Sequence, residues 1–181
     1  RSTRPAWNDE NLMQLSEKIR SHLLFAHVRA ASPGSVVAER LCHPFRCGRY
    51  LFMHNGNVGG FDKVRRKLMD RLNDACFEFA VANGASDTVV CFALFLNTFP
   101  DHMATVSPDV LRKNTESVVE LIVATCQECN VQETSLLNFV ISDGLTLLAT
   151  RFVYDPLCPH SSPASLYFGA GTAYESKRTT T

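Results

Sequence analysis

Residues Leu51–Phe61 read Leu-Phe-Met-His-Asn-Gly-Asn-Val-Gly-Gly-Phe, and the rest of the chain is interpreted outward from them. The apolar start predicts a strand, and the polar, glycine-rich continuation predicts a turn. A rigid strand that ends in such a turn can present hydrogen-bond donors to a ligand. If the protein is an enzyme, we expect Asn55 and Gly56 to lie at its chemistry.

The composition limits the class of protein. The chain has 181 residues, about one domain, and can bury a core without disulfides or metals. Its 18 basic and 18 acidic residues balance, which argues against a nucleic acid or an anionic membrane as partner. Seven scattered cysteines favour a reducing compartment over a disulfide framework. No apolar run is long enough to span a bilayer, so we expect a cytoplasmic protein with no membrane partner.

Hydrophobic periodicity predicts helices and strands in a mixed order. Helices are expected from an Asn8 cap to Ile19, where the helix would cover a core, and then over 61–79, 88–97 and 107–128. Strands are expected over 23–30, 50–54, 136–142 and 145–154, with a short one at 166–168. Asp143-Gly144 should join the last two long strands as a hairpin. Strands early, helices in the middle and strands late indicate an α+β fold.

Three polar groups stand at the ends of apolar elements: Arg29, the Asn55-Gly56 pair and Asp87. Each has a structural explanation, because Arg29 could pair with a surface carboxylate, Asn55-Gly56 could be only a turn, and Asp87 could be a helix cap. Together they suit a zwitterionic amino-acid ligand. The guanidinium would bind its carboxylate, Asp87 its ammonium group, and Asn55 with Gly56 a carbonyl oxygen that becomes an oxyanion.

Five short motifs occur in the order found in one enzyme family. They are His27–Ala30, Cys42–Phe45, His54–Gly56, Ser86–Thr88 and Asn138–Gly144. On these motifs the chain resembles the class II glutamine amidotransferases, and within them the YafJ-like branch that includes the fungal amidotransferase subunit of glutathione breakdown. The resemblance covers most of the chain up to about Tyr154. Each motif alone is weak, but the combination is specific.

The resemblance implies an N-terminal-nucleophile fold, a four-layer αββα sandwich of antiparallel sheets. It also implies an amidotransferase domain over 1–154, a C-terminal extension over 155–181 that is partly loop or disordered, and no cofactor or metal. The expected nucleophile is an N-terminal cysteine whose own α-amino group acts as base.

The resemblance implies a role for each residue of this chain that matches a functional position of the family. Arg29 would bind the substrate α-carboxylate, Asp87 the α-amino group, and Asn55 and Gly56 would form the oxyanion hole. Ser32 and His43 would line the pocket.

The chain departs from the family pattern in three places. It begins with Arg1 rather than cysteine, Leu41 stands where asparagine is usual, and Val89 stands where glutamate is usual. We therefore expect the nucleophile and the first strands to lie upstream. The full-length protein would hydrolyse glutamine or a γ-glutamyl amide through a γ-glutamyl thioester, with a partner subunit compatible with that activity. This fragment alone would be inactive. The alternative is an inactive remnant that keeps a ligand-binding or interaction surface.

Other motifs favour ordinary structure. A protease would have to pair Cys42 or Cys47 with His43 or His54, but nucleophile and base usually come from separate elements. The same residues match zinc-site spacing poorly. Cys126 and Cys129 end a predicted helix rather than opening a thioredoxin-like unit. The basic residues between Lys63 and Arg71 fall mainly on the polar face of their helix.

Overall fold

One antiparallel sheet forms the centre of the computed structural model, which describes residues 2–28, 37–167 and 169–171. Its strand order is β1-β2-β3-β4, and β5 also pairs with β3. The strands are β1 (Phe45–Cys47), β2 (Tyr50–Asn57), β3 (Ser135–Ser142), β4 (Leu147–Ala149) and β5 (Val153–Tyr154). The sheet therefore joins segments that lie about 80 residues apart in the sequence.

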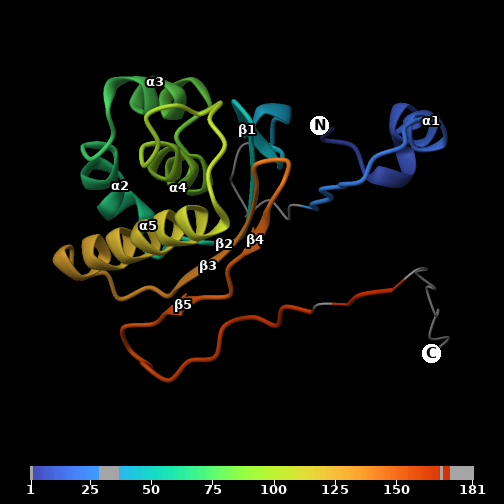
Figure 1. Ribbon diagram of the computed structural model, residues 1–181. Coiled ribbons are helices and arrows are strands. Elements are labelled where there is room, and N and C mark those ends of the chain that lie inside the picture. The colour runs from blue at the N-terminus through green and yellow to red at the C-terminus, as the bar shows by residue number, and fades with distance from the viewer. Residues whose placement is uncertain (1, 29–36, 168, 172–181) are drawn as a thin grey trace, which may run out of the picture.

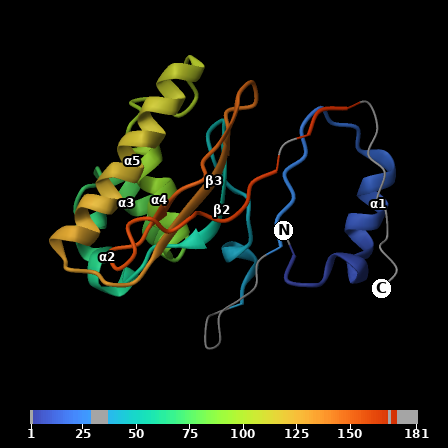
Figure 2. The ribbon, with the colours of Figure 1, turned by 90° about the horizontal axis from the view of Figure 1, so that it is seen from below.

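Five α-helices accompany the sheet within the described residues: α1 (Glu10–Lys18), α2 (Phe61–Met69), α3 (Asp74–Ala82), α4 (Asp87–Leu96) and α5 (Pro108–Glu128). Short 3-10 turns occupy Ala6–Asn8 and Glu39–Leu41. Helices α2 to α5 form a layer on one side of the sheet, whereas α1 lies apart from that layer in both views (Figures 1 and 2). The α+β prediction is confirmed. None of the described helices is both long and apolar enough to cross a membrane.

Helix α4 is the central element of the core. Nine of its ten residues are buried, as expected for a helix that is apolar all round. Phe92 stacks on Phe52 of β2 with ring centroids 5.0 Å apart, and it meets Phe79 of α3 edge-on at 5.5 Å. The helix thereby ties the sheet to the outer helices, and its predicted position is confirmed.

Strands β2 and β3 run antiparallel, and their register places Asn55 opposite Asn138. The hairpin predicted at Asp143-Gly144 joins β3 to β4. Its turn is held by the Asp143 carboxylate, whose Oδ1 accepts from the backbone N–H groups of Leu145 and Thr146 at 2.9 and 2.7 Å. The side chain of the turn residue thus stabilises the loop that the sequence indicated.

Two predicted elements are divided in the structure. The helix expected over 61–79 is two helices, because the Asn73 side chain accepts from Cys76 N–H at 2.9 Å and starts α3 anew. Both helices face one core, so their apolar spacing looks continuous. The strand expected over 145–154 is interrupted at Thr150, whose hydroxyl donates to Leu137 O at 2.7 Å and accepts from Phe139 N–H at 2.8 Å. At this point the Thr150 hydroxyl, rather than a backbone group, is the hydrogen-bond partner of Leu137 O and Phe139 N–H on β3.

The predictions for the N-terminal region were partly wrong. Helix α1 is capped by Asp9, which accepts from Leu12 N–H at 3.0 Å, rather than by Asn8. It has no buried residue and covers no core among the described residues. Residues 23–28 form no strand, and neither do 166 and 167; the remaining residues of both predicted strands lie outside the described part. A strand needs a hydrogen-bonded neighbour, and no described segment pairs with these residues.

Candidate active site

The structure gathers several of the predicted site residues at one end of β2. Asn55 and Gly56 lie near the end of that strand, and Asp87 is the first residue of α4. His43 lies in the loop before β1. Arg29 and Ser32 lie outside the described residues, so their predicted roles stay predictions.

The backbone of Gly56 faces away from β3. Its partner in the register is Leu137, whose N–H donates to Phe152 O at 2.9 Å and whose carbonyl accepts from the Thr150 hydroxyl at 2.7 Å. Both polar groups of Leu137 are therefore directed toward the far side of β3. In an antiparallel pair such positions exchange no hydrogen bonds. The Gly56 N–H consequently points out of the β2–β3 ladder, where a ligand oxygen could accept from it.

Glycine is required at position 56 for two reasons. Its φ of +146° is one that L side chains rarely adopt, and a Cβ there would collide with the carbonyl oxygen of Leu136. The strand backbone thus approaches β3 more closely than any other residue would allow. The glycine of the Asn-Gly sequence is therefore required by the strand geometry.

Asp87 reaches from α4 to the end of β2. Ser86 caps the helix, accepting from Val89 N–H at 3.4 Å, so Asp87 does not serve as the cap. Instead its Oδ2 accepts from Val58 N–H at 3.2 Å, while its Oδ1 accepts from Thr88 N–H at 2.8 Å. The carboxylate is partly exposed, and Val58, whose N–H it accepts from, lies two residues beyond Gly56 along the chain. The structure therefore brings this acid next to the Asn55-Gly56 pair. The turn predicted at that pair is wrong, because both residues pair with β3 as part of β2 and the turn follows at Gly59-Gly60.

His54 is buried on the helix side of the sheet, with 2% of its surface exposed. Its Nε2 lies 2.8 Å from Leu136 O, and its Nδ1 lies 3.1 Å from the Thr88 hydroxyl. Burial lowers the pKa of this imidazole below 6.5, which the hydrogen bond to Leu136 and the charge of Asp87 oppose only in part. The ring is therefore a neutral hydrogen-bonding group.

His43 lies against His27 beside the same strand. The His27 Nε2–H donates to the backbone carbonyl of His54 at 3.2 Å. The rings of His27 and His43 are 4.1 Å apart, and His43 is 5.1 Å from the ring of Phe45. These contacts place His43 near the edge of β2 toward which Gly56 N–H points. Whether it lines a substrate pocket stays a prediction.

Asn138 is a site residue to which sequence reasoning assigned no role. Its Nδ2 donates to Asn55 O at 3.0 Å, and its Oδ1 accepts from Phe152 N–H at 3.2 Å. It thereby fastens the backbone of Asn55 to β3. The available signal was an asparagine within the apolar run Leu136–Ser142, where an unpartnered amide would be costly.

A cavity of about 130 Å³ opens beside Asn55. Its walls include Asn138 of β3, Thr150 between β4 and β5, and Ala164–Leu166 from the C-terminal segment. The Arg151 guanidinium holds that segment by donating to the carbonyls of Pro163 and Ala164, each at 2.8 Å. The C-terminal segment therefore forms one wall of the space in front of Asn55.

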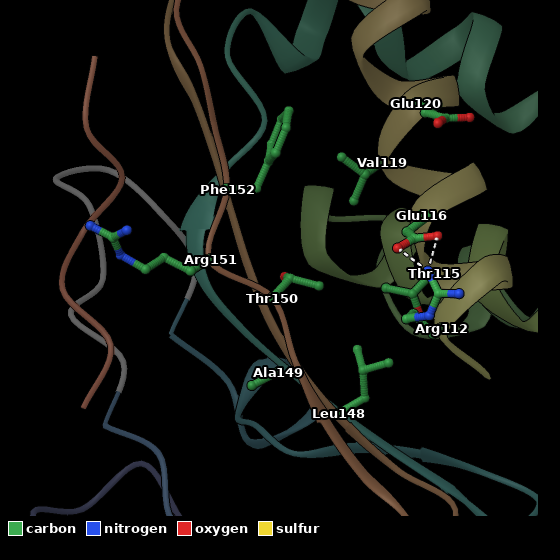
Figure 3. A pocket seen from close by; sticks show the side chains of 10 residues that line it. All are labelled: Arg112, Thr115, Glu116, Val119, Glu120, Leu148, Ala149, Thr150, Arg151 and Phe152. Atoms are coloured by element: carbon green, nitrogen blue, oxygen red, sulfur yellow. Dashed lines mark hydrogen bonds and ion pairs between the residues drawn. The ribbon is translucent and has the colours of Figure 1, made fainter. Parts of the chain in front are cut away.

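A larger cavity of about 450 Å³ lies between α5 and the chain from Leu148 to Phe152. It is lined by Arg112, Glu116 and Val119 from the helix, and Figure 3 shows Arg112 joined to Glu116 while the Arg151 side chain points away. None of the predicted site residues borders it. Of the predicted site residues, Asn55 lines the smaller cavity, whereas Gly56, Asp87 and His43 line neither of the two.

The cysteine alternatives gain no support from the geometry. Cys42 Sγ lies 3.4 Å from Ser2 O, and Cys47 Sγ lies 3.7 Å from Nδ1 of His102 rather than beside His43 or His54. Burial raises the pKa of the Cys47 thiol, which disfavours a thiolate nucleophile. Within the described residues, no three His, Cys, Asp or Glu side chains are grouped to hold a metal ion.

Comparison with known proteins defines the class. The family model of the class II glutamine amidotransferases matches residues 8–156. The probable glutamine amidotransferase DUG3 of Saccharomyces cerevisiae is 36% identical, over 94% of this chain and 49% of its own length. A gamma-glutamyl-hercynylcysteine sulfoxide hydrolase of Mycobacterium tuberculosis is 36% identical over 58 residues, which are 32% of this chain and 25% of that protein.

A solved structure agrees with these sequence matches. The glutamine aminotransferase class-II domain protein of Silicibacter pomeroyi superposes with a TM-score of 0.63 and 28% identity, over 86% of this chain and 60% of that one. The chain belongs to the class II glutamine amidotransferase family. It spans about half the length of the yeast relative.

Proposed function

We propose that the full-length protein hydrolyses the side-chain amide of glutamine, or the γ-amide of another γ-glutamyl compound. The observation that carries this proposal is the arrangement at the end of β2. There the Gly56 N–H points out of the sheet, and the Asp87 carboxylate is hydrogen-bonded to Val58 two residues further on. An oxyanion donor and an ammonium acceptor so arranged suit an amino acid whose side-chain carbonyl reacts.

The proposed reaction passes through a thioester on an N-terminal cysteine that precedes the 181 residues. The thiol attacks the γ-carbonyl carbon while the cysteine's own α-amino group takes the thiol proton. The C–N bond then breaks, and the same amine returns the proton to the departing ammonia or amine. Water attacks the thioester next, which releases glutamate and regenerates the thiol.

Residues of this chain bind and orient the γ-glutamyl group in that scheme. The Asn55 side-chain amide and the Gly56 N–H stabilise the oxyanion, and Asp87 binds the α-ammonium group. Arg29 is proposed to bind the α-carboxylate by a bidentate fork, with Ser32 and His43 as pocket walls. Asn138 holds the Asn55 carbonyl at 3.0 Å, which keeps the oxyanion strand in register.

The proposed substrates are glutamine, glutathione and related γ-glutamyl compounds. The yeast relative is described as a probable glutamine amidotransferase, and the mycobacterial relative as a hydrolase of a γ-glutamyl compound. Both descriptions share the γ-glutamyl group that the site would bind. A partner subunit that uses the released ammonia is compatible with the same chemistry.

A substrate panel on the full-length protein tests the proposal. Release of glutamate from glutamine, glutathione and simple γ-glutamyl amides is measured, with the matching β-aspartyl amides as controls for chain length. We expect turnover of at least one γ-glutamyl compound and no comparable turnover of the β-aspartyl series. A protein that releases no glutamate from any of them would instead be the inactive remnant.

A further inference from the structure

His54 and Val58 lie on either side of the Asn55–Asn57 end of β2, and each is tied to one of two consecutive residues of α4. The His54 ring meets the Thr88 hydroxyl at 3.1 Å, and Val58 N–H donates to Asp87 at 3.2 Å. The segment from His54 to Val58, which includes the end of β2, is therefore held at both ends by the dipeptide Asp87-Thr88. The second tie is the proposed ammonium-binding carboxylate itself, whereas the first has no role in the reaction described above.

The hydrogen-bond pattern assigns the tautomer of His54. The carbonyl of Leu136 can only accept, so the Nε2 atom at 2.8 Å must carry a proton. Nδ1 of the neutral ring is then an acceptor, and the Thr88 hydroxyl is its donor at 3.1 Å. The lowered pKa of the buried imidazole agrees with a neutral ring. Every ring nitrogen of His54 is thus satisfied, and one of them depends on Thr88.

Thr88 is buried, as His54 is. Its side chain is 6% exposed, and its backbone N–H donates to Oδ1 of Asp87 at 2.8 Å. A displacement of Thr88 therefore moves both the carboxylate and the ring that precedes Asn55. The contact lies across the interface between α4 and β2, which local sequence preferences do not fix.

We propose that the Thr88–His54 hydrogen bond is a positioning contact that sets the separation between the oxyanion hole and the ammonium site. This inference rests on the proposed function. A substrate that carries both an α-ammonium group and a γ-carbonyl must reach Asp87 and the Asn55-Gly56 donors at the same time. The fixed separation is what makes a γ-glutamyl group fit, and Thr88 determines that separation without touching the substrate.

The test compares two substrates that differ by the group that Asp87 binds. Full-length protein is assayed with glutamine and with 4-carbamoylbutanoate, which is glutamine without its α-amino group. Thr88→Val keeps the shape of the side chain but removes the donor. We expect it to lower kcat for glutamine roughly tenfold, as for a lost buried hydrogen bond, with little change in KM. Turnover of the desamino substrate should stay within about twofold of wild type, because that substrate does not need both anchors at once.

Two variants control for folding. Thr88→Ser keeps a hydroxyl and should restore most of the activity on glutamine. Thr115→Val removes an equally buried hydroxyl on α5, which donates to Leu111 O at 2.8 Å, and should leave the kinetic constants unchanged. Equal losses on both substrates in Thr88→Val would mean a general structural role and would overturn the positioning proposal.

A spectroscopic measurement supplies a readout besides activity. Long-range ¹H–¹⁵N spectra of the full-length protein should show His54 protonated at Nε2, with an Nδ1 resonance that shifts in Thr88→Val and not in Thr88→Ser. A ring protonated at Nδ1 in the wild type contradicts the proposal. Wild type that turns over no γ-glutamyl compound overturns the proposed function, whereas an active wild type matched by Thr88→Val overturns only the positioning role.

Discussion

At the level of single residues, Asn55 combines an exposed side chain with a tightly held backbone. Its side chain lies on the face of β2 opposite the buried His54, while its carbonyl accepts from Asn138 Nδ2 at 3.0 Å. The amide is therefore free to serve a ligand without supporting the core. Because the side chain is exposed while the backbone is held, a substitution of Asn55 allows activity and stability to be tested independently.

Asn55→Ala in the full-length protein should lower kcat about 10²- to 10³-fold, as the loss of one oxyanion donor typically does. Its melting temperature should change little because the side chain is exposed. Steady-state glutaminase kinetics and a thermal unfolding curve measure the two effects.

Asn57→Ala is the matched control for that variant. Asn57 lies on the same face of the same strand, and its Nδ2 has only a long contact of 3.4 Å to Thr134 O. It should retain near-normal turnover. If Asn55→Ala were as active as Asn57→Ala, Asn55 would not be an oxyanion donor.

Among the elements, α4 contributes both to the candidate site and to the hydrophobic core. Its first turn supplies Asp87 and Thr88 to the site, and the rest of the helix packs Phe92 against β2 and α3. Packing therefore fixes where the polar first turn meets the end of β2. The position of the site depends on aromatic contacts several residues away.

Phe92→Ala should reduce the free energy of unfolding by about 3–5 kcal/mol, because a large buried ring leaves a cavity. Phe77→Ala on α3 removes a ring that is 38% exposed and should cost about 1 kcal/mol or less. Urea unfolding of both variants checks the difference. Similar losses would contradict the central place of α4 in the core.

Across the whole molecule, stability should depend on pH through buried His54. Burial holds its pKa below 6.5 in the folded state, with His27 lowering it further and Asp87 opposing. The unfolded chain therefore binds more protons below about pH 6.5, so stability is lost as the pH falls through that value. One such group contributes at most about 1.4 kcal/mol per pH unit.

Unfolding free energies measured between about pH 8 and 5 test this linkage. His54→Asn should flatten the decline with falling pH, whatever its effect on stability at neutral pH. His160→Gln, at an exposed histidine, should leave the decline as in the wild type. An unchanged slope in His54→Asn would show that other groups control acid unfolding.

Local signals in the sequence predicted much of the fold but not its boundaries. The all-round apolar character of 88–97 and the capped start at Ser107 give α4 and α5 within a residue or two. The break at Asn73 was missed because two helices facing one core share a single hydrophobic period. The predicted burial of α1 was wrong because an amphipathic helix does not specify which segment covers its apolar face.

The sequence by itself determined the α+β class, the apolar start of β2 and the polar residue at the start of α4, because these follow from periodicity and caps within a few residues. It placed the turn at Asn55-Gly56, but β2 continues through Asn57 because both residues pair with β3. Only the tertiary structure decided that Asp87 meets Val58 and that Thr88 meets His54. Those hydrogen bonds join residues 29 and 34 positions apart. They exist because core packing docks α4 on β2, and local preference does not encode such docking.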